Sequence, residues 1–215
     1  MNIYCIPGLA NDRRIFDNLS PLLNGNIIYL EHLGPIKDES LKDYAIRLSS
    51  KVDNPSESIL IGFSLGGMIA VELNKIHKFK KMFLISTVKH PFEFPPLIKI
   101  ARKYFVDNNL IIPSWLIKNN VKFITKLLNT TDYFGREHLH KQISKSTDDH
   151  ILWAQKAVLQ WDNKLIPDNY IHIHGTKDEI FPLGNIRATH YIQGGNHYMI
   201  MDKSEEVAKI INGNI

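Results

Sequence analysis

The sequence predicts an α/β fold built around a mainly parallel sheet. Six short apolar runs are spaced along the chain, and amphipathic segments of helical spacing separate the first four of them. Strands that alternate with helices in this way form βαβ units, whose parallel strands are covered on both faces. A long middle stretch without strand alternation precedes the last two runs, so we expect a helical insertion there.

Each expected element has its own local signal. The strands are apolar runs that end near breakers such as Pro7-Gly8 and Gly34-Pro35, and we place them at 3–6, 27–30, 59–63, 81–85, 170–174 and 188–193. The helices follow apolar spacing of three and four residues, and Ser40 is placed to cap the second. They are expected at 13–23, 41–48, 67–74, 97–106, 114–128, 136–146, 149–160 and 203–211.

Length and composition indicate one globular domain over 1–215, with the insertion at about 87–150. Apolar residues at 44% and charged residues at 22% exclude a disordered or fibrous class. The apolar runs are too short to span a bilayer, and the first residues lack the pattern of a signal peptide. The single cysteine, Cys5, cannot form an internal disulfide. We therefore predict a cytoplasmic protein, as a monomer or small homo-oligomer.

The positive charge belongs to the middle of the chain. The net charge is +4, and residues 89–164 contain 12 Lys and Arg against 7 Asp and Glu. These basic residues are dispersed, which favours a solvated helical surface over a nucleic-acid site. A face that attracts an anionic substrate or carrier is the alternative.

The most informative segment is Gly62-Phe63-Ser64-Leu65-Gly66, which stands between an expected strand and an expected helix. A serine at such a strand-to-helix turn is held in a strained conformation that exposes its hydroxyl. Glycines two residues before and after it avoid side-chain collisions in the tight turn. The following helix also directs N–H groups toward a developing oxyanion.

With this motif the chain resembles the α/β-hydrolase superfamily. The resemblance implies the α/β-hydrolase fold, with a six-stranded sheet in the order 2-1-3-4-5-6 and a helical lid. It also implies a Ser-Asp-His triad in that chain order. The segment His174-Gly175-Thr176-Lys177-Asp178 is similar to the family's acid loop, and Gly194-Gly195-Asn196-His197 is similar to its histidine loop. Ser64 is then the nucleophile, His197 the base and Asp178 the residue that orients it.

Other residues compete for two of these roles. Glu179 adjoins Asp178, although the spacing to Gly175 and Pro182 favours Asp178. His174 and His190 compete with His197, but both fall in or beside expected strands. The spacing of His172, His174 and Asp178 is weakly similar to a metal site, yet Thr176 and Lys177 occupy positions where a metallohydrolase needs ligands. We expect neither a metal nor a cofactor.

The family resemblance also implies an oxyanion hole and a substrate pocket. The backbone N–H groups of Leu65 and Leu9 are the expected donors. Pro7 stands where the family usually has histidine, so one bracing hydrogen bond is lost. We expect pocket-lining residues within the lid, with His90, Phe92 and Trp115 as candidates among aromatic residues that include Phe94, Phe105 and Phe123. Trp153 and Trp161, eight residues apart, are expected to pack against the sheet.

The sequence therefore predicts a serine hydrolase that cleaves a small carboxylic ester or thioester through an acyl-enzyme. The same triad could instead serve a C–C hydrolase, a lyase or a perhydrolase. A ligand-binding receptor of this fold with little turnover is a second alternative, and an interaction module without catalysis is a third. A haloalkane dehalogenase would need Asp at position 64. The expected partner is a small molecule, with no nucleic acid and no membrane span.

Overall fold

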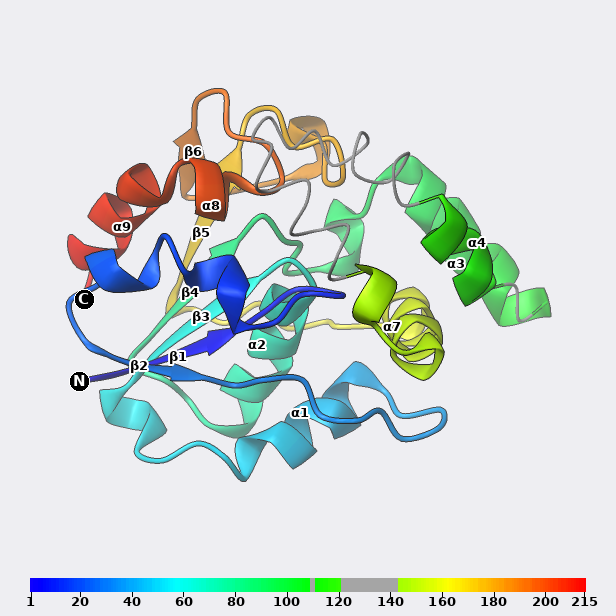
Figure 1. Ribbon diagram of the computed structural model, residues 1–215, viewed down its shortest axis with the longest axis horizontal. Helices are drawn as coiled ribbons and strands as arrows, with labels where there is room; N and C mark the ends of the chain where they lie inside the picture. The colour runs from blue at the N-terminus through cyan, green and yellow to red at the C-terminus, as the bar shows by residue number, and fades with distance from the viewer. Residues whose placement is uncertain (109–110, 121–142) are drawn as a thin grey trace.

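The structure is a computed structural model that describes residues 1–108, 111–120 and 143–215 (Figure 1). The strands are β1 (Asn2–Ile6), β2 (Asn26–Tyr29), β3 (Ile59–Phe63), β4 (Lys81–Ile85), β5 (Tyr170–Gly175) and β6 (His190–Ile192). The α-helices are α1 (Leu41–Ser49), α2 (Leu65–Ile76), α3 (Pro96–Asn108), α4 (Ser114–Asn119), α7 (Asp148–Gln160), α8 (Met199–Asp202) and α9 (Ser204–Asn212).

The six strands form one sheet in the order β2-β1-β3-β4-β5-β6, which confirms the expected order. Every pairing in this sheet is parallel, for example Ile61 beside Cys5 on one side and beside Phe83 on the other. Parallel strands bring their carboxyl ends to one edge of the sheet. The residues that follow β1, β3, β5 and β6 therefore meet at that edge.

Two apolar layers cover the sheet because alternate strand residues point to opposite faces. On one face, Tyr4, Leu60 and Leu84 pack with residues of α1, α2 and α7. On the other face, Ile3, Ile61 and Ile173 pack with residues of the segment 15–23, α8 and α9. Figure 1 shows α1 below the sheet and α9 above it. The central strands β1, β3, β4 and β5 are buried on both faces, which explains why their sequences are mostly apolar, whereas the edge strands β2 and β6 are partly exposed.

The predicted helix over 13–23 is wrong. The segment forms two 3₁₀ turns, Arg13–Phe16 and Ser20–Leu22. Asp12 caps the first turn by accepting a hydrogen bond from the N–H of Arg14 at 3.0 Å. Pro21 lies at the start of the second turn and, with no N–H to donate, it cannot continue an α-helix. The apolar positions of this segment do face the core, since Ile15, Phe16 and Leu19 are buried.

Most other expected elements are confirmed, with shifted ends. The helix after Ser64 begins at Leu65 rather than at residue 67, and the strand expected at 188–193 is shortened to β6. The predicted helix 114–128 corresponds to α4, which ends at Asn119 with Asn120 as its C-cap, and residues 121–128 lie outside the described residues. Residues 136–142 of another expected helix also lie outside them.

In Figure 1 the helices of the middle segment lie to the right of the sheet, where α3 and α4 project farther from it than α7. Trp153 on α7 and Trp161, which caps the end of that helix, are buried in the same apolar layer as α1 and α2, as expected. Their indole N–H groups donate to Glu39 O at 2.9 Å and to Glu72 Oε1 at 2.7 Å. Among the described residues, no helix is long and apolar enough to cross a membrane.

Candidate active site

Ser64 lies between the end of β3 and the start of α2, in a left-handed conformation with φ of 52° and ψ of −120°. Such a conformation costs a non-glycine residue about 1–3 kcal/mol and persists only where neighbouring contacts hold it. The N–H of Ser64 donates to Ile85 O at 3.0 Å, and its carbonyl accepts from Thr87 Oγ1 at 2.6 Å. Residues at the end of β4 therefore hold the turn from both sides.

The two motif glycines leave space that a side chain would fill. A Cβ on Gly62 would lie 2.5 Å from Gly66 O, and a Cβ on Gly66 would lie 2.2 Å from Ile6 O. Both atoms belong to the backbone, which cannot move aside without shifting the strand or helix. The predicted steric reason for glycine at these positions is confirmed, because helix α2 starts in contact with the carboxyl end of β1.

The sheet edge brings three sequence-distant side chains into one hydrogen-bonded line. His197 Nε2 lies 3.0 Å from Ser64 Oγ, and His197 Nδ1 lies 2.9 Å from Asp178 Oδ2. The Asp178 side chain is fully buried and that of His197 is 4% exposed. A carboxylate only accepts hydrogen bonds, so Nδ1 carries the proton and Nε2 faces the serine hydroxyl as an acceptor.

Asp178 is fixed by its loop as well as by His197. Its Oδ1 accepts the N–H groups of Ile180 and Phe181, each at 2.9 Å. Burial by itself would raise the pKa of Asp178, but its interactions with His197, His174 and the N–H of Phe181 together outweigh burial and hold the pKa below its ordinary value. The carboxylate is thus ionised at neutral pH. The competing Glu179 is exposed to solvent.

The other two histidines considered for the base position lie elsewhere. His174 donates from Nε2 to Phe181 O at 2.8 Å, and burial lowers its pKa. It therefore stands behind Asp178 and fixes the acid loop. His190 lies on β6, where its Nδ1 is 3.1 Å from Thr189 Oγ1.

The residues considered for a metal site are occupied by other contacts. His172 contacts Thr87 O at 3.1 Å through Nε2, and its Nδ1 lies 3.4 Å from Lys89 Nζ. A lysine ammonium at this distance disfavours a second cation. Among the described residues, no group of three or more His, Cys, Asp or Glu side chains could hold a metal ion.

The two expected oxyanion donors flank Ser64. Leu65 is the first residue of α2, where an N–H group has no intrahelical acceptor. Leu9 belongs to the loop after β1, and a Cβ on its neighbour Gly8 would lie 3.1 Å from Ser64 Cβ. Within the described residues, no hydrogen bond uses the N–H of Leu9 or Leu65. Both N–H groups are therefore candidate donors for a ligand beside the serine.

A cavity of about 220 Å³ opens over Ser64. Its lining is mostly apolar and comprises Leu9, Ala10, Asn11, Phe63, Ser64, Ile117, Ile143, Ile151, Ile180, His197 and Tyr198. Helices α4 and α7 contribute Ile117 and Ile151, so the middle segment of the chain does help to shape this cavity. Such a space suits a small, largely apolar group next to the serine hydroxyl.

The candidates His90, Phe92 and Trp115 are not among the described residues that line this cavity. Phe92 is 81% exposed, because Phe94 takes the buried position of the short 3₁₀ turn at Pro91–Glu93. His90 caps that turn by accepting the N–H of Phe92, and the two rings stack. Trp115 is 61% exposed. Phe123 lies outside the described residues.

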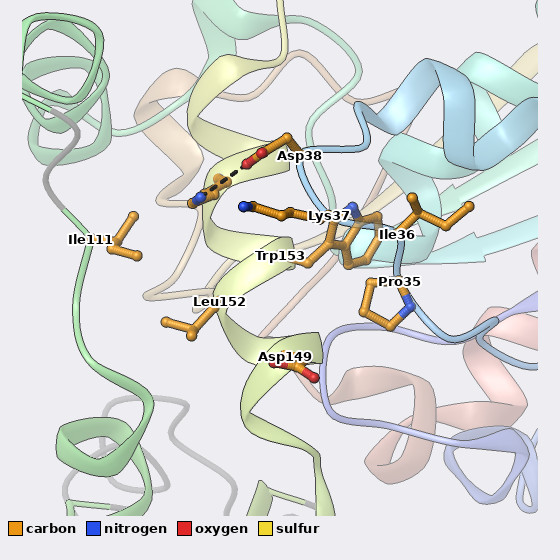
Figure 2. Close-up of a pocket in the computed structure, with 9 residues that line it drawn as sticks. Pro35, Ile36, Lys37, Asp38, Ile111, Asp149, Leu152 and Trp153 are labelled. Carbon is orange, nitrogen blue, oxygen red and sulfur yellow. Dashed lines mark hydrogen bonds and ion pairs between the residues drawn. The ribbon is translucent and has the colours of Figure 1, made fainter.

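A larger groove of about 470 Å³ is separate from the serine (Figure 2). It lies between the loop at 35–38 and the face of α7 that carries Leu152 and Trp153, and Lys156 forms an ion pair with Asp38 at 3.1 Å beside it. None of its lining residues also lines the Ser64 cavity. Although this groove is larger, it does not reach Ser64 and therefore takes no part in the chemistry there.

Sequence reasoning missed a buried ion pair behind the acid loop. Lys89 Nζ contacts the carboxylate of Glu93, and it also donates to Arg187 O at 2.7 Å. Glu93 in turn accepts the N–H groups of Lys89 at 2.9 Å and Arg187 at 3.2 Å. Both side chains are less than 10% exposed. The pair joins the segment after β4 to the segment before β6, and its i,i+4 spacing was the only signal in the sequence.

Comparison with solved structures places this fold in a known class. No family model matches the sequence, and a search of curated proteins finds no match. An esterase from Thermogutta terrifontis superposes with a TM-score of 0.75 at 14% identity, over 99% of this chain and 88% of that one. A structure described with carboxylesterases of Nitrososphaera gargenis gives 0.70 at 17% identity, over 99% and 88%.

A bromoperoxidase from Bacillus anthracis gives a TM-score of 0.72 at 14% identity, over 98% of this chain and 90% of that one. These neighbours share the α/β-hydrolase fold. The chain therefore has the α/β-hydrolase fold, which confirms the resemblance stated from its motifs. Because one fold serves many reactions, the activity must be argued from the site itself.

Proposed function

We propose that this protein is a serine hydrolase that cleaves a small carboxylic ester or thioester through an acyl-enzyme. The observation that carries the proposal is the hydrogen-bonded line from Ser64 Oγ through His197 to the buried carboxylate of Asp178. A serine hydroxyl alone is a weak nucleophile, and this arrangement is the one that activates it. The esterase structures with the same fold are consistent with the proposal.

In the first half of the reaction, Ser64 Oγ attacks the ester carbonyl carbon and His197 Nε2 takes the hydroxyl proton. Asp178 stabilises the resulting imidazolium and keeps Nδ1 protonated. The carbonyl electrons move to the oxygen, which the N–H groups of Leu9 and Leu65 stabilise. The intermediate then collapses, and the alcohol or thiol leaves with the proton from His197.

In the second half, a water molecule gives a proton to His197 Nε2 and attacks the acyl carbon. The bond to Ser64 Oγ breaks, Ser64 regains its proton from His197, and the carboxylic acid is released. The apolar cavity of about 220 Å³ would hold the acyl group. Pockets that bind drug-sized ligands measure about 300–1,000 Å³, so a short acyl chain is the better fit for this smaller cavity.

The test is labelling with a fluorophosphonate, followed by intact-mass measurement and peptide mapping. We expect one adduct per chain, located on Ser64, and no adduct in Ser64→Ala or His197→Ala. Ester hydrolysis by Ser64→Ala should fall in kcat by about 10³ to 10⁶. Folded wild-type protein without an adduct would contradict the proposal and favour a ligand-binding receptor. An adduct without ester or thioester turnover would point to the C–C hydrolase or lyase alternative.

A further inference from the structure

The loop after β1 contains a peptide unit with two roles, that of Gly8 and Leu9. Its N–H belongs to Leu9, the proposed oxyanion donor, and its carbonyl belongs to Gly8. In a trans peptide these two groups lie in one plane and point in opposite directions. A hydrogen bond donated to Gly8 O therefore sets the direction of the Leu9 N–H. Pro7 cannot supply this bond, because it has neither a polar side chain nor an N–H.

His32 donates that bond from the segment after β2. Its Nε2 lies 2.9 Å from Gly8 O, and a carbonyl oxygen only accepts, so Nε2 must carry the proton. The N–H of Asn11 also donates to Gly8 O, at 3.1 Å, which closes the loop as a turn. The His32 bond is the one that reaches this carbonyl from outside the loop.

A second contact keeps the proton on the correct nitrogen of His32. Tyr44 Oη accepts the N–H of Leu33 at 2.8 Å and lies 3.3 Å from His32 Nδ1. When Nε2 carries the proton, Nδ1 can only accept, so the Tyr44 hydroxyl donates to Nδ1 and favours this tautomer. The neutral imidazole then has its only proton on Nε2, facing Gly8 O. Tyr44 is fully buried in the layer that also contains Trp153, so this support is rigid.

The loop needs such support because it contains a strained residue. Ala10 has φ of 56°, a left-handed conformation that side chains other than glycine rarely adopt. Strained backbone relaxes by rotating its peptide planes unless neighbouring contacts prevent it. Asn11 Nδ2 holds the next carbonyl, Leu9 O, at 2.9 Å, so the planes on both sides of Leu9 are each fixed by a hydrogen bond.

We infer that His32 is a positioning residue that holds the Gly8–Leu9 peptide with its N–H toward the oxyanion. This inference rests on the proposed hydrolase function. The hydrogen bond to Gly8 O also draws electrons toward that oxygen, which strengthens the N–H of Leu9 as a donor. His32 thus provides, from the segment after β2, the bracing that histidine at position 7 would provide.

Three substitutions of His32 separate the effect of losing the hydrogen bond from the effect of losing the volume of the ring. His32→Gln places an amide N–H near the position of Nε2 and should keep the bond. His32→Asn places its amide near Nδ1, short of Gly8 O, and should lose it. His32→Phe fills the same space beside His150 without a donor. Alanine is a poorer choice, because His32 borders a polar cleft of about 280 Å³ from which water could replace the lost donor.

We expect His32→Phe and His32→Asn to lower kcat about tenfold to a hundredfold with KM nearly unchanged, and His32→Gln to stay within about threefold of wild type. This loss is smaller than the 10² to 10³ that removal of a donor costs, because the N–H of Leu9 is displaced and not deleted. Affinity for a trifluoromethyl ketone, whose adduct with Ser64 carries an oxyanion, should fall in parallel with kcat. A purely structural defect would alter KM and the melting temperature instead.

An NMR measurement tests the inference without any turnover. In ¹⁵N-labelled protein, the Leu9 amide should shift in His32→Phe and His32→Asn and remain close to wild type in His32→Gln. Equal Leu9 shifts in all three variants, or wild-type kcat in His32→Phe, would overturn the inference. If wild-type protein fails to react with the fluorophosphonate but the Leu9 shifts follow this pattern, the proposed function fails and the positioning contact stands.

Discussion

The side chain of Asn11 is hydrogen bonded to the hydroxyl of Tyr198, the residue that follows His197. Asn11 Nδ2 lies 3.1 Å from Tyr198 Oη, and the hydroxyl lies 3.3 Å from Asn11 Oδ1. Both side chains are buried, and the two residues are 187 positions apart in the sequence. The contact therefore joins the loop that bears Leu9 to the loop that bears His197.

Removing this contact should affect both stability and rate. Tyr198→Phe removes the hydroxyl that donates to Asn11 Oδ1, and this buried oxygen then has no donor among the described residues, although Nδ2 keeps its bond to Leu9 O. Such an unpaired buried group costs about 1–3 kcal/mol. We expect the free energy of unfolding in urea to fall by that amount and kcat to fall severalfold. Tyr191→Phe is the matched control, because its hydroxyl also makes hydrogen bonds, with Ala188 N–H at 3.1 Å and Ile186 O at 3.4 Å, but on a side chain that is 48% exposed. Water can replace these bonds, so the loss should be under about 0.5 kcal/mol. Equal effects of the two substitutions would contradict the prediction.

Asp178→Asn tests whether the carboxylate sets the tautomer of His197. The asparagine amide can donate toward Nδ1, which would move the imidazole proton to Nε2 and leave no base facing Ser64. We expect kcat to fall by about 10⁴ with little change in KM. Glu179→Gln alters the exposed neighbouring carboxylate and should keep kcat within about twofold. A large loss of kcat in Glu179→Gln, with little loss in Asp178→Asn, would assign the role of orienting His197 to Glu179 instead of Asp178.

The buried pair of Lys89 and Glu93 should be much more sensitive to a single substitution than to a double one. Lys89→Met leaves the Glu93 carboxylate buried without its cation, which costs about 3–5 kcal/mol. Lys89→Met with Glu93→Gln removes both charges and keeps an oxygen to accept the N–H of Arg187. We expect the double variant to regain most of the loss in urea unfolding. A single variant as stable as wild type would show that the pair contributes little.

Acid should destabilise the protein through His150. Burial, followed by repulsion from His32, lowers the pKa of His150 to about 4 from an ordinary 6.5. The unfolded chain therefore binds the proton first, so stability falls as the pH drops from about 6.5 to about 4. The full contribution is on the order of 3 kcal/mol. His32, His172 and His174 have lowered pKa values too and add to the same slope.

His150→Phe should remove part of this slope. Nε2 of His150 is buried and finds no hydrogen-bond partner among the described residues, so phenylalanine loses no contact at that atom. We expect the variant to match or exceed wild type in the free energy of unfolding at pH 5, with a smaller difference between pH 5 and pH 7.5. An unchanged pH dependence of the free energy of unfolding would contradict the lowered pKa that burial gives His150.

The parallel sheet could be foreseen from local signals, whereas its strand order and the roles of Ser64, Asp178 and His197 followed from the resemblance of their motifs to the α/β-hydrolase superfamily. Apolar runs mark the strands, and the residues that end parallel strands must lie at one edge. The helix expected at 13–23 failed for a local reason as well, since the effect of Pro21 outweighed the apolar spacing. Treating Pro21 as a helix breaker would have predicted that no continuous helix spans 13–23.

The supporting contacts could not be foreseen. No pattern links His32 to Gly8, or Asn11 to Tyr198, because each contact depends on where separate loops meet in three dimensions. The pocket candidates failed for a related reason. Phe92 and Phe94 are equally apolar in the sequence, but only the turn geometry decides which of them is buried.

The sheet order also has a consequence for how the molecule folds. Strands β1 to β4 come from the first 85 residues, whereas β5 begins at Tyr170 and must pair with β4 across a long intervening segment. Closing so long a loop costs entropy and slows pairing. We therefore expect β5 and β6 to dock onto a partly formed sheet. Ser64 would then be in place before Asp178 and His197 arrive, and a chain caught at that stage would be chemically inert.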